Sequence, residues 1–292
     1  MPRITIVHTT KYRYRNPVVL TRHRMMLRPD DSHDLRLHEA SLVIDPAPAS
    51  IRWAHDVYNN SICFVDWPAS LKTEHLTIVS TLDLTHHPDG PDLPDFTLYP
   101  SAETLPFSYP ERDFPDLAHL AQPHTPDPDG RVAAWARYFA PEGARTLKML
   151  ADMTHAIKAD FRYQERHEEG TQTAAETLAL GSGTCRDFAV LMIGALRHLG
   201  LAARFVTGYL YDDTSGTTRG GGSTHAWCSV YLPGAGWVEY DPTNGLLAGA
   251  NLVRVGVTRT AEQASPIAGG YIGAAGDALG LDVCVAVSAV PL

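Results

Sequence analysis

Ten prolines fall within residues 86–130 and divide the chain into two parts with different hydrophobic periods. Proline fixes φ and removes a backbone donor, so this stretch is expected to form an extended connector with only short regular elements. Before it, apolar and polar residues alternate, and after it apolar residues first recur at helical spacing. Since 292 residues suffice for two domains, we predict one domain at 1–85, the connector at 86–130 and a second domain at 131–292.

Residues 1–85 carry the pattern of an antiparallel β domain. The segment 76–84 reads L-T-I-V-S-T-L-D-L, in which apolar residues recur at every second position. Turn sequences such as the Asn-Pro pair at 16–17 and the Asn-Asn pair at 59–60 separate the apolar runs. Short strands joined by polar turns predict a sandwich-like domain.

The second domain begins with helical patterns and continues with strands. An apolar stripe over residues 185–199 predicts an amphipathic helix, which follows a Gly-Ser-Gly-Thr turn and ends at Gly200. Strand patterns at 226–232 and 237–240 flank a Pro-Gly-Ala-Gly turn and predict a hairpin. The whole chain is therefore predicted to be α+β, an N-terminal antiparallel β sandwich followed by a core in which the helix packs on an antiparallel sheet.

Composition narrows the class of protein. A net charge of −9 disfavours a nucleic-acid partner, which would require a basic surface. Four cysteines are too few for a disulfide scaffold, and because no two form a C-x-x-C pair we expect no metal site. Neither a phosphate-binding loop nor an H-E-x-x-H helix is present, so no cofactor is expected. A signal peptide and long apolar runs are also missing, which predicts a cytoplasmic protein without a membrane partner.

One cysteine lies where a nucleophile is expected. Cys185 begins the predicted helix, where exposed N–H groups and the helix dipole favour thiolate over thiol and can also hold an oxyanion. His225 begins one hairpin strand and Asp241 ends the other. A register that pairs His225 with Asp241 places both on one face, as a base and its orienting carboxylate require. Each of the three residues has a structural interpretation alone, and their combination favours a catalytic one.

The segments around these residues resemble the transglutaminase-like superfamily of papain-like cysteine enzymes, in its bacterial form with an N-terminal β domain. The matching segments are G-T-C-R-D-F-A at 183–189, residues 196–209, H-A-W at 225–227 and G-W-V-E-Y-D-P-T-N at 236–244. The resemblance implies a papain- or transglutaminase-like core. It also implies that Cys185 is the nucleophile, His225 the general base and acid, and Asp241 the residue that orients His225.

Two neighbours of this predicted triad are candidates for substrate binding. Arg186 replaces the glutamine associated with bacterial members of the family, and it could stabilise the thiolate, bind an acidic substrate group or only pair with a surface carboxylate. Trp227 could form the wall of a pocket or belong to the core. Cys228 has the opposite strand parity to His225 and should face away from the site. The glycine-rich segment 212–222 is predicted to be a mobile loop that controls access.

These features predict cysteine-dependent acyl transfer on amide bonds of a peptide or protein. The thiolate would form a thioester, which water resolves in a peptidase or amidase and an amine resolves in a transglutaminase. We favour hydrolysis slightly. The alternative is a non-catalytic peptide-binding module on the same fold. A separation well beyond about 5 Å between the Cys185 sulfur and a His225 nitrogen would favour that alternative.

Overall fold

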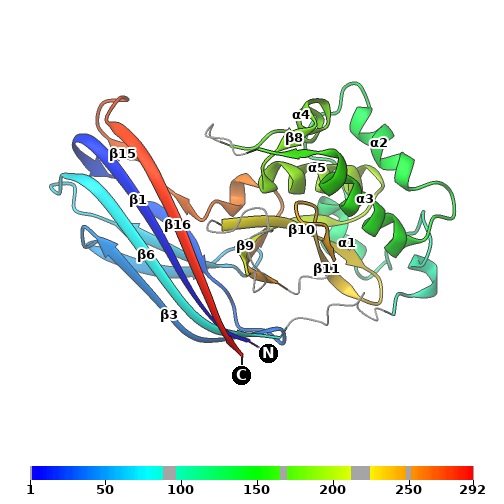
Figure 1. Cartoon of the computed structure of the whole chain (residues 1–292), viewed down its shortest axis with the longest axis horizontal. Helices are drawn as coiled ribbons and strands as arrows, with labels where there is room; N and C mark the ends of the chain where they lie inside the picture. The colour runs from blue at the N-terminus through cyan, green and yellow to red at the C-terminus, as the bar shows by residue number, and fades with distance from the viewer. Residues whose placement is uncertain (1, 88–96, 165–169, 212–223, 248–250, 292) are drawn as a thin grey trace.

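The computed structural model describes residues 2–87, 97–164, 170–211, 224–247 and 251–291 (Figure 1). A long, twisted β sandwich lies on one side of the molecule, and an α+β unit with its helices on the outer side lies on the other. Both ends of the chain meet in the sandwich. This arrangement confirms the predicted α+β class with an N-terminal antiparallel β region.

The sandwich consists of two antiparallel sheets. The first has the order β15-β1-β6-β3, with β16 also paired to β1, and the second has the order β14-β2-β5-β4. Alternating residues such as Met25, Cys63 and Ile78 fill the space between the sheets. The strand bounds are β1 Pro2–Leu20, β2 His23–Arg28, β3 Leu35–Asp45, β4 Ser50–His55, β5 Ser61–Asp66, β6 Thr73–His86, β14 Ile267–Ala268, β15 Tyr271–Ile272 and β16 Ala278–Pro291.

The C-terminal strand corrects the boundary expected at 131–292. Strand β16 pairs along β1, from Pro2 opposite Pro291 to Tyr14 opposite Ala278, so the last segment of the chain belongs to the sandwich. An apolar strand must satisfy its backbone groups against another strand, and β1 offers an edge on the side that β6 does not occupy. The hydrophobic pattern identifies such a strand but not its distant partner.

The described part of the connector, residues 97–130, is fixed against the α+β unit. Its regular elements are short: η1 Pro100–Ala102, α1 Phe114–Leu117 and η2 Ala118–Leu120. Leu117 and Leu120 pack with Ala202. The Tyr109 hydroxyl accepts a hydrogen bond from the Ala202 N–H at 2.7 Å and donates one to the Tyr231 carbonyl at 3.2 Å. Proline therefore shortens the elements without detaching the segment from the core.

The α+β unit is built on an antiparallel sheet of order β12-β11-β10-β9-β13. Helix α5 covers one face, where its apolar stripe packs against Ala226, Cys228 and Val230. The other face meets the sandwich, where Tyr209 and Val253 pack among sandwich residues. The bounds are α2 Arg131–Phe139, α3 Thr146–Asp160, β7 Arg162–Tyr163, α4 Ala174–Leu180, β8 Ser182–Gly183, α5 Cys185–His198, β9 Ala203–Leu210, β10 Thr224–Leu232, β11 Gly236–Asp241, β12 Leu246–Leu247, β13 Leu252–Thr258 and η3 Glu262–Ala264.

Helix α5 ends as the sequence predicts. Gly200 has φ of 76°, in the left-handed region that favours glycine. Its N–H bonds the Arg197 carbonyl and the Leu201 N–H bonds the Leu196 carbonyl, both at 3.0 Å. These two bonds satisfy carbonyls that the last turn would otherwise leave open.

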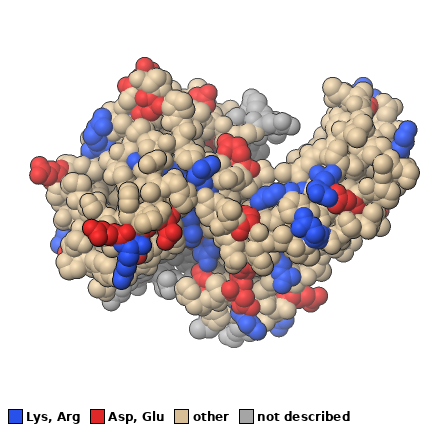
Figure 2. Space-filling model, turned by 180° about the vertical axis from the view of Figure 1, so that it is seen from behind, with Lys and Arg blue, Asp and Glu red and all other residues tan. Residues whose placement is uncertain are grey.

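The surface carries charges of both signs. Seen from behind, basic and acidic side chains are interspersed among the described residues, without a broad basic area on that face (Figure 2). No described helix is both long and apolar enough to cross a membrane.

Candidate active site

Cys185 is the first residue of α5, and a capping box fixes that start. The Thr184 hydroxyl oxygen accepts from the Asp187 N–H at 3.4 Å, and the buried Asp187 carboxylate accepts from the Thr184 N–H at 2.8 Å. The other Asp187 oxygen accepts from the Gln172 N–H at 2.7 Å. A Cβ at Gly183 would lie 2.7 Å from the Asp187 Cβ, so this close turn requires glycine. Asp187 therefore positions the helix start that carries the cysteine.

His225 and Asp241 form a buried pair. The distance from His225 Nε2 to Asp241 Oδ2 is 2.8 Å, and the two residues are 1% and 0% exposed. Burial alone would lower the pKa of His225, but the charge and hydrogen bond of Asp241 outweigh it and raise that pKa above its ordinary value. The same attraction outweighs burial at Asp241 and holds the carboxyl pKa below its usual range. The pair is therefore an imidazolium and a carboxylate at neutral pH.

The thiol of Cys185 lies close enough to the His225 ring to contribute to its raised pKa. Because Nε2 is used by Asp241, Nδ1 is the ring nitrogen that remains for the sulfur. Nδ1 is buried and has no hydrogen-bond partner among the described residues, and this includes the Cys185 sulfur. The structure thus bonds His225 to Asp241 and places Cys185 near the ring without a hydrogen bond to it, so the catalytic role of the three residues stays a prediction.

The hairpin register differs from the prediction by two residues. Cys228 lies opposite Tyr240 and Leu232 opposite Gly236, so the continued ladder places Asp241 opposite Trp227 instead of His225. The turn is a three-residue loop at 233–235, and β11 begins after it at Gly236, which adopts a φ of 78°. The centre of the turn therefore lies at residue 234 instead of 233. A shift of two preserves side-chain parity, so Asp241 still reaches His225 diagonally.

The turn after β11 holds the Asp241 carboxylate. Oδ1 accepts from the N–H groups of Thr243 and Asn244, at 2.9 and 3.3 Å. Oδ2 accepts from the Asn244 side-chain amide at 2.9 Å, beside the bond from His225. The D-P-T-N sequence predicts a turn in which the aspartate binds backbone N–H groups. It gives no sign of the Asn244 side-chain bond, so sequence reasoning missed Asn244 as a residue of the site.

The two predicted substrate-binding residues are held by the protein framework. Trp227 is fully buried and stacks on His225, with ring centroids 5.9 Å apart and an interplanar angle of 26°. Arg186 donates to the Ala261 carbonyl at 2.5 Å, and its guanidinium lies 5.1 Å from the centroid of the Phe205 ring. Neither contact involves a surface carboxylate. A role of either residue in substrate binding stays a prediction.

Other expectations concern the surroundings of the site. Cys228 packs against α5 in the core, and burial raises the pKa of its thiol, which favours the unreactive protonated form. The predicted loop at 212–222 lies outside the described residues. Within the part of the chain that the structure describes, no group of three or more His, Cys, Asp or Glu side chains is arranged to hold a metal ion.

Comparison with known proteins places this geometry in a family. Residues 133–242 match the transglutaminase-like superfamily, and residues 4–85 match the bacterial transglutaminase-like N-terminal region. An uncharacterized protein of Mycobacterium tuberculosis (strain ATCC 25618 / H37Rv) is 32% identical over 279 residues, covering 91% of this chain and 87% of the relative. The chain therefore belongs to the transglutaminase-like superfamily and carries its bacterial N-terminal region.

Two further likenesses extend over almost the whole chain. An uncharacterized protein of Mycobacterium leprae (strain TN) is 27% identical over 294 residues, covering 99% of both chains. A crystal structure from Cytophaga hutchinsonii, described as that of a candidate cysteine protease, aligns with a TM-score of 0.73 at 17% identity. That alignment covers 100% of this chain and 92% of the other, and it shows that the complete two-part fold is shared.

Proposed function

We propose that this protein is a Cys185-dependent enzyme that cleaves or exchanges amide bonds of a peptide or protein through a thioester. The observation that carries the proposal is the order of groups at the site. Cys185 begins a capped helix beside a histidine whose far nitrogen is bonded at 2.8 Å to a buried aspartate. This order of nucleophile, base and orienting carboxylate is the one that covalent catalysis requires.

In the proposed reaction the Cys185 thiolate attacks the carbonyl carbon and a carbon–sulfur bond forms. The developing oxyanion accepts hydrogen bonds at the start of α5, where the first N–H groups have no partner within the helix. His225, kept protonated by Asp241, gives its proton to the leaving amine as the carbon–nitrogen bond breaks. The neutral ring then takes a proton from water or an incoming amine, which attacks the thioester and restores the thiolate.

Hydrolysis is the outcome that we favour over transfer to an amine. The description of the Cytophaga hutchinsonii protein as a candidate cysteine protease supports this choice at the level of the fold. A cytoplasmic location also remains part of the proposal. It rests on four cysteines that are all free, as a reducing compartment would keep them.

The first experiment traps the acyl-enzyme by mass spectrometry after incubation with a casein digest. A covalent acyl adduct on the peptide that contains Cys185 is expected, and Cys185→Ala should give neither adduct nor turnover while retaining its fold. Cys284→Ala is the matched control, because it removes an exposed thiol from the sandwich. Undiminished turnover by Cys185→Ala would exclude the mechanism.

The peptide-binding module remains the second candidate, and one observation favours it: Cys185 is only 7% exposed, which limits access to its sulfur. Competitive labelling with iodoacetamide near neutral pH separates the two candidates. An activated Cys185 should react faster than Cys284 although Cys284 is the exposed thiol. Faster labelling of Cys284 would favour the non-catalytic module.

A further inference from the structure

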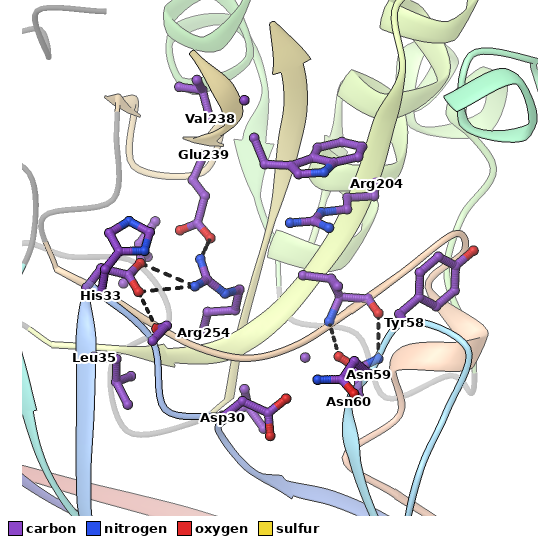
Figure 3. Close-up of a pocket in the computed structure, with 18 of the residues that line it drawn as sticks. Asp30, His33, Leu35, Tyr58, Asn59, Asn60, Arg204, Val238, Glu239 and Arg254 are labelled. Atoms are coloured by element: carbon purple, nitrogen blue, oxygen red, sulfur yellow. Dashed lines mark hydrogen bonds and ion pairs between the residues drawn. The ribbon is translucent and has the colours of Figure 1, made fainter. Parts of the chain in front are cut away.

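A cavity of about 560 Å³ lies between the sandwich and the sheet face that α5 does not cover (Figure 3). Sandwich loops around residues 30–35 and 58–60 form one side, and β9, β11 and β13 form the other. The described residues that line it include neither Cys185 nor His225 nor Asp241. The cavity is therefore separate from the proposed catalytic site, although both are built on the same sheet.

Two arginines of the cavity have very different surroundings. Arg254 is neutralised, since it donates to Glu239 at 2.7 Å and to Asp34 at 3.2 Å. Arg204 donates from Nε to the Ser229 hydroxyl at 2.9 Å, and its guanidinium lies 4.0 Å from the centroid of the Trp237 ring. Among the described residues, no carboxylate forms an ion pair with Arg204. Arg254 therefore forms ion pairs with two carboxylates, whereas Arg204 forms none with a described residue.

The unused donors of Arg204 are available to a ligand. A guanidinium carries five N–H donors, and the hydrogen bond to Ser229 uses one of them. Figure 3 shows the guanidinium of Arg204 extending from β9 into the cavity. Stacking on Trp237 fixes the plane of the group and leaves its edge open. An arginine held in this way is preorganised for two parallel hydrogen bonds to a carboxylate.

Electrostatics also favours an anion beside Arg204. Burial and repulsion from Arg254 lower the pKa of Arg204 to about 10, and the attraction of Glu239 offsets them only in part, so the side chain stays charged at neutral pH in surroundings that oppose the charge. A buried charge without a counterion is unfavourable. A carboxylate that enters the cavity would supply the missing counterion.

The sandwich side of the cavity carries the opposite charge. Asp30 lines it as an exposed residue without a hydrogen bond or ion pair to another described residue, although His55 and Arg28 lie near enough to attract its carboxylate. Partial burial raises the pKa of this carboxyl. A cation on one wall and an anion on the other complement a ligand with both charges. The volume lies in the usual range for small-molecule sites, which is about 300–1,000 Å³.

We propose that this cavity binds a small zwitterion of the amino-acid or short-peptide class, with the ligand carboxylate on Arg204 and its ammonium group toward Asp30. The backbone of β13 would contact the body of the ligand. This site requires no chemistry at Cys185, so the two proposals can fail separately.

Calorimetric titration of the Cys185→Ala protein tests the site without consuming the probe. Trialanine and free alanine serve as probes and distinguish a peptide from a single amino acid, and either one should bind. Amidation of the carboxylate of the better probe should weaken binding at least about tenfold, since charge-assisted hydrogen bonds are lost. Acetylation of its amino group should weaken binding by a smaller factor.

Two variants test whether the probes bind at Arg204. Arg204→Gln in the Cys185→Ala background should lose at least about tenfold in affinity. Arg52→Gln is the matched control, because the Arg52 guanidinium also covers a ring, Phe64 at 4.7 Å, but lies outside the cavity. Equal affinity of the free acid and the amide would overturn the proposal even if Arg204→Gln fails to fold. Unchanged affinity in Arg204→Gln, or no binding of either probe, would overturn it as well.

Discussion

Two buried histidines, one at the candidate active site and one between the sandwich and the sheet, differ in charge at neutral pH: the first is protonated and the second is neutral. His225 is 1% exposed and pairs with the carboxylate of Asp241. His8 is 3% exposed and pairs with two neutral groups, the Tyr209 hydroxyl and the Thr10 hydroxyl, both at 3.0 Å. The pKa of His225 is raised, whereas burial lowers that of His8 to about 4. His225 is at least as deeply buried as His8 and still has the higher pKa, so the charge of the partner decides.

The difference explains why only one of these histidines can serve the proposed chemistry. The neutral ring of His8 is hydrogen-bonded to a hydroxyl group through each of its two nitrogens. Both nitrogens are therefore occupied, and the role of the ring is structural. The ring of His225 keeps a proton, is oriented from one side and retains a nitrogen for Cys185. A histidine and a carboxylate that are both fully buried and bonded to each other, as His225 and Asp241 are, thus distinguish the candidate site from the region around His8.

The largest expected effect comes from removing the charged partner of His225. Asp241→Ala should reduce kcat/KM about 10³-fold, because His225 loses both its orientation and its proton at neutral pH. Peptide hydrolysis measured from pH 5 to 10 would detect this loss. Asp83→Asn, which breaks an ion pair with Arg3 in the sandwich, is the control and should leave the rate unchanged.

The variant Asp241→Asn separates orientation from charge. The amide keeps the size of the carboxylate, but its single oxygen cannot accept both from the backbone N–H groups of Thr243 and Asn244 and from Nε2, so only a small part of the activity should return. Because the charge no longer raises the pKa of His225, the alkaline limb of the rate profile should move to lower pH. If the limb stays in place, the raised pKa has another cause and the contrast with His8 is wrong.

Local sequence signals predicted the candidate active site around His225 better than the contacts around His8. The start of α5, the parity of the hairpin and Gly200 all follow from residues a few positions apart, and so does the position of Cys185. The contact of His8 with Tyr209 joins residues 201 positions apart, and Arg254 meets Asp34 across 220. Hydrophobic periods carry no information about such pairings. For the same reason β16 was assigned to the wrong domain, and the interdomain cavity was not foreseen.

The next prediction concerns the pH dependence of stability. The unfolded chain protonates His8 below about pH 6.5, whereas the folded chain does so only near pH 4. Stability should therefore fall as the pH is lowered from 6.5 toward 4, by about 3 kcal/mol from this group. The raised pKa of His225 works in the other direction, since its contribution is complete below pH 6.5 and declines as the pH rises.

Urea unfolding of wild type and His8→Gln from pH 4 to 7 would measure the His8 contribution. The variant should lose part of the acid sensitivity, and the remainder should come from groups such as His23 and His86, whose pKa values burial also lowers. Identical pH slopes for the two proteins would show that His8 is not buried as a neutral ring.

A further prediction tests whether Asp241 must be held in position by Asn244. Asn244→Ala removes the amide that donates to Asp241 Oδ2 at 2.9 Å, and it should lower kcat about tenfold with little change in KM. The acid limb of the rate profile should also shift, because one of the bonds that stabilise the carboxylate is lost. Asn16→Ala is a matched control, since its amide likewise donates to an aspartate, Asp277 at 2.7 Å, but in the sandwich. An equal loss in both variants would indicate a general effect on stability and no positioning role.

The smallest expected effect lies on the side of His8. Tyr209→Phe removes the hydroxyl bonded to His8 Nδ1 and should cost about 1 kcal/mol of unfolding free energy at pH 7, while kcat stays unchanged. Tyr138→Phe is the control, because Tyr138 is 81% exposed and its hydroxyl should contribute less than about 0.5 kcal/mol. Tyr209 lies in β9, next to the strand that carries His225. This variant therefore also tests whether a change beside His8 alters the activity that depends on His225. A fall in kcat as large as that of Asn244→Ala would show that the packing between the sandwich and the sheet affects the candidate catalytic residues.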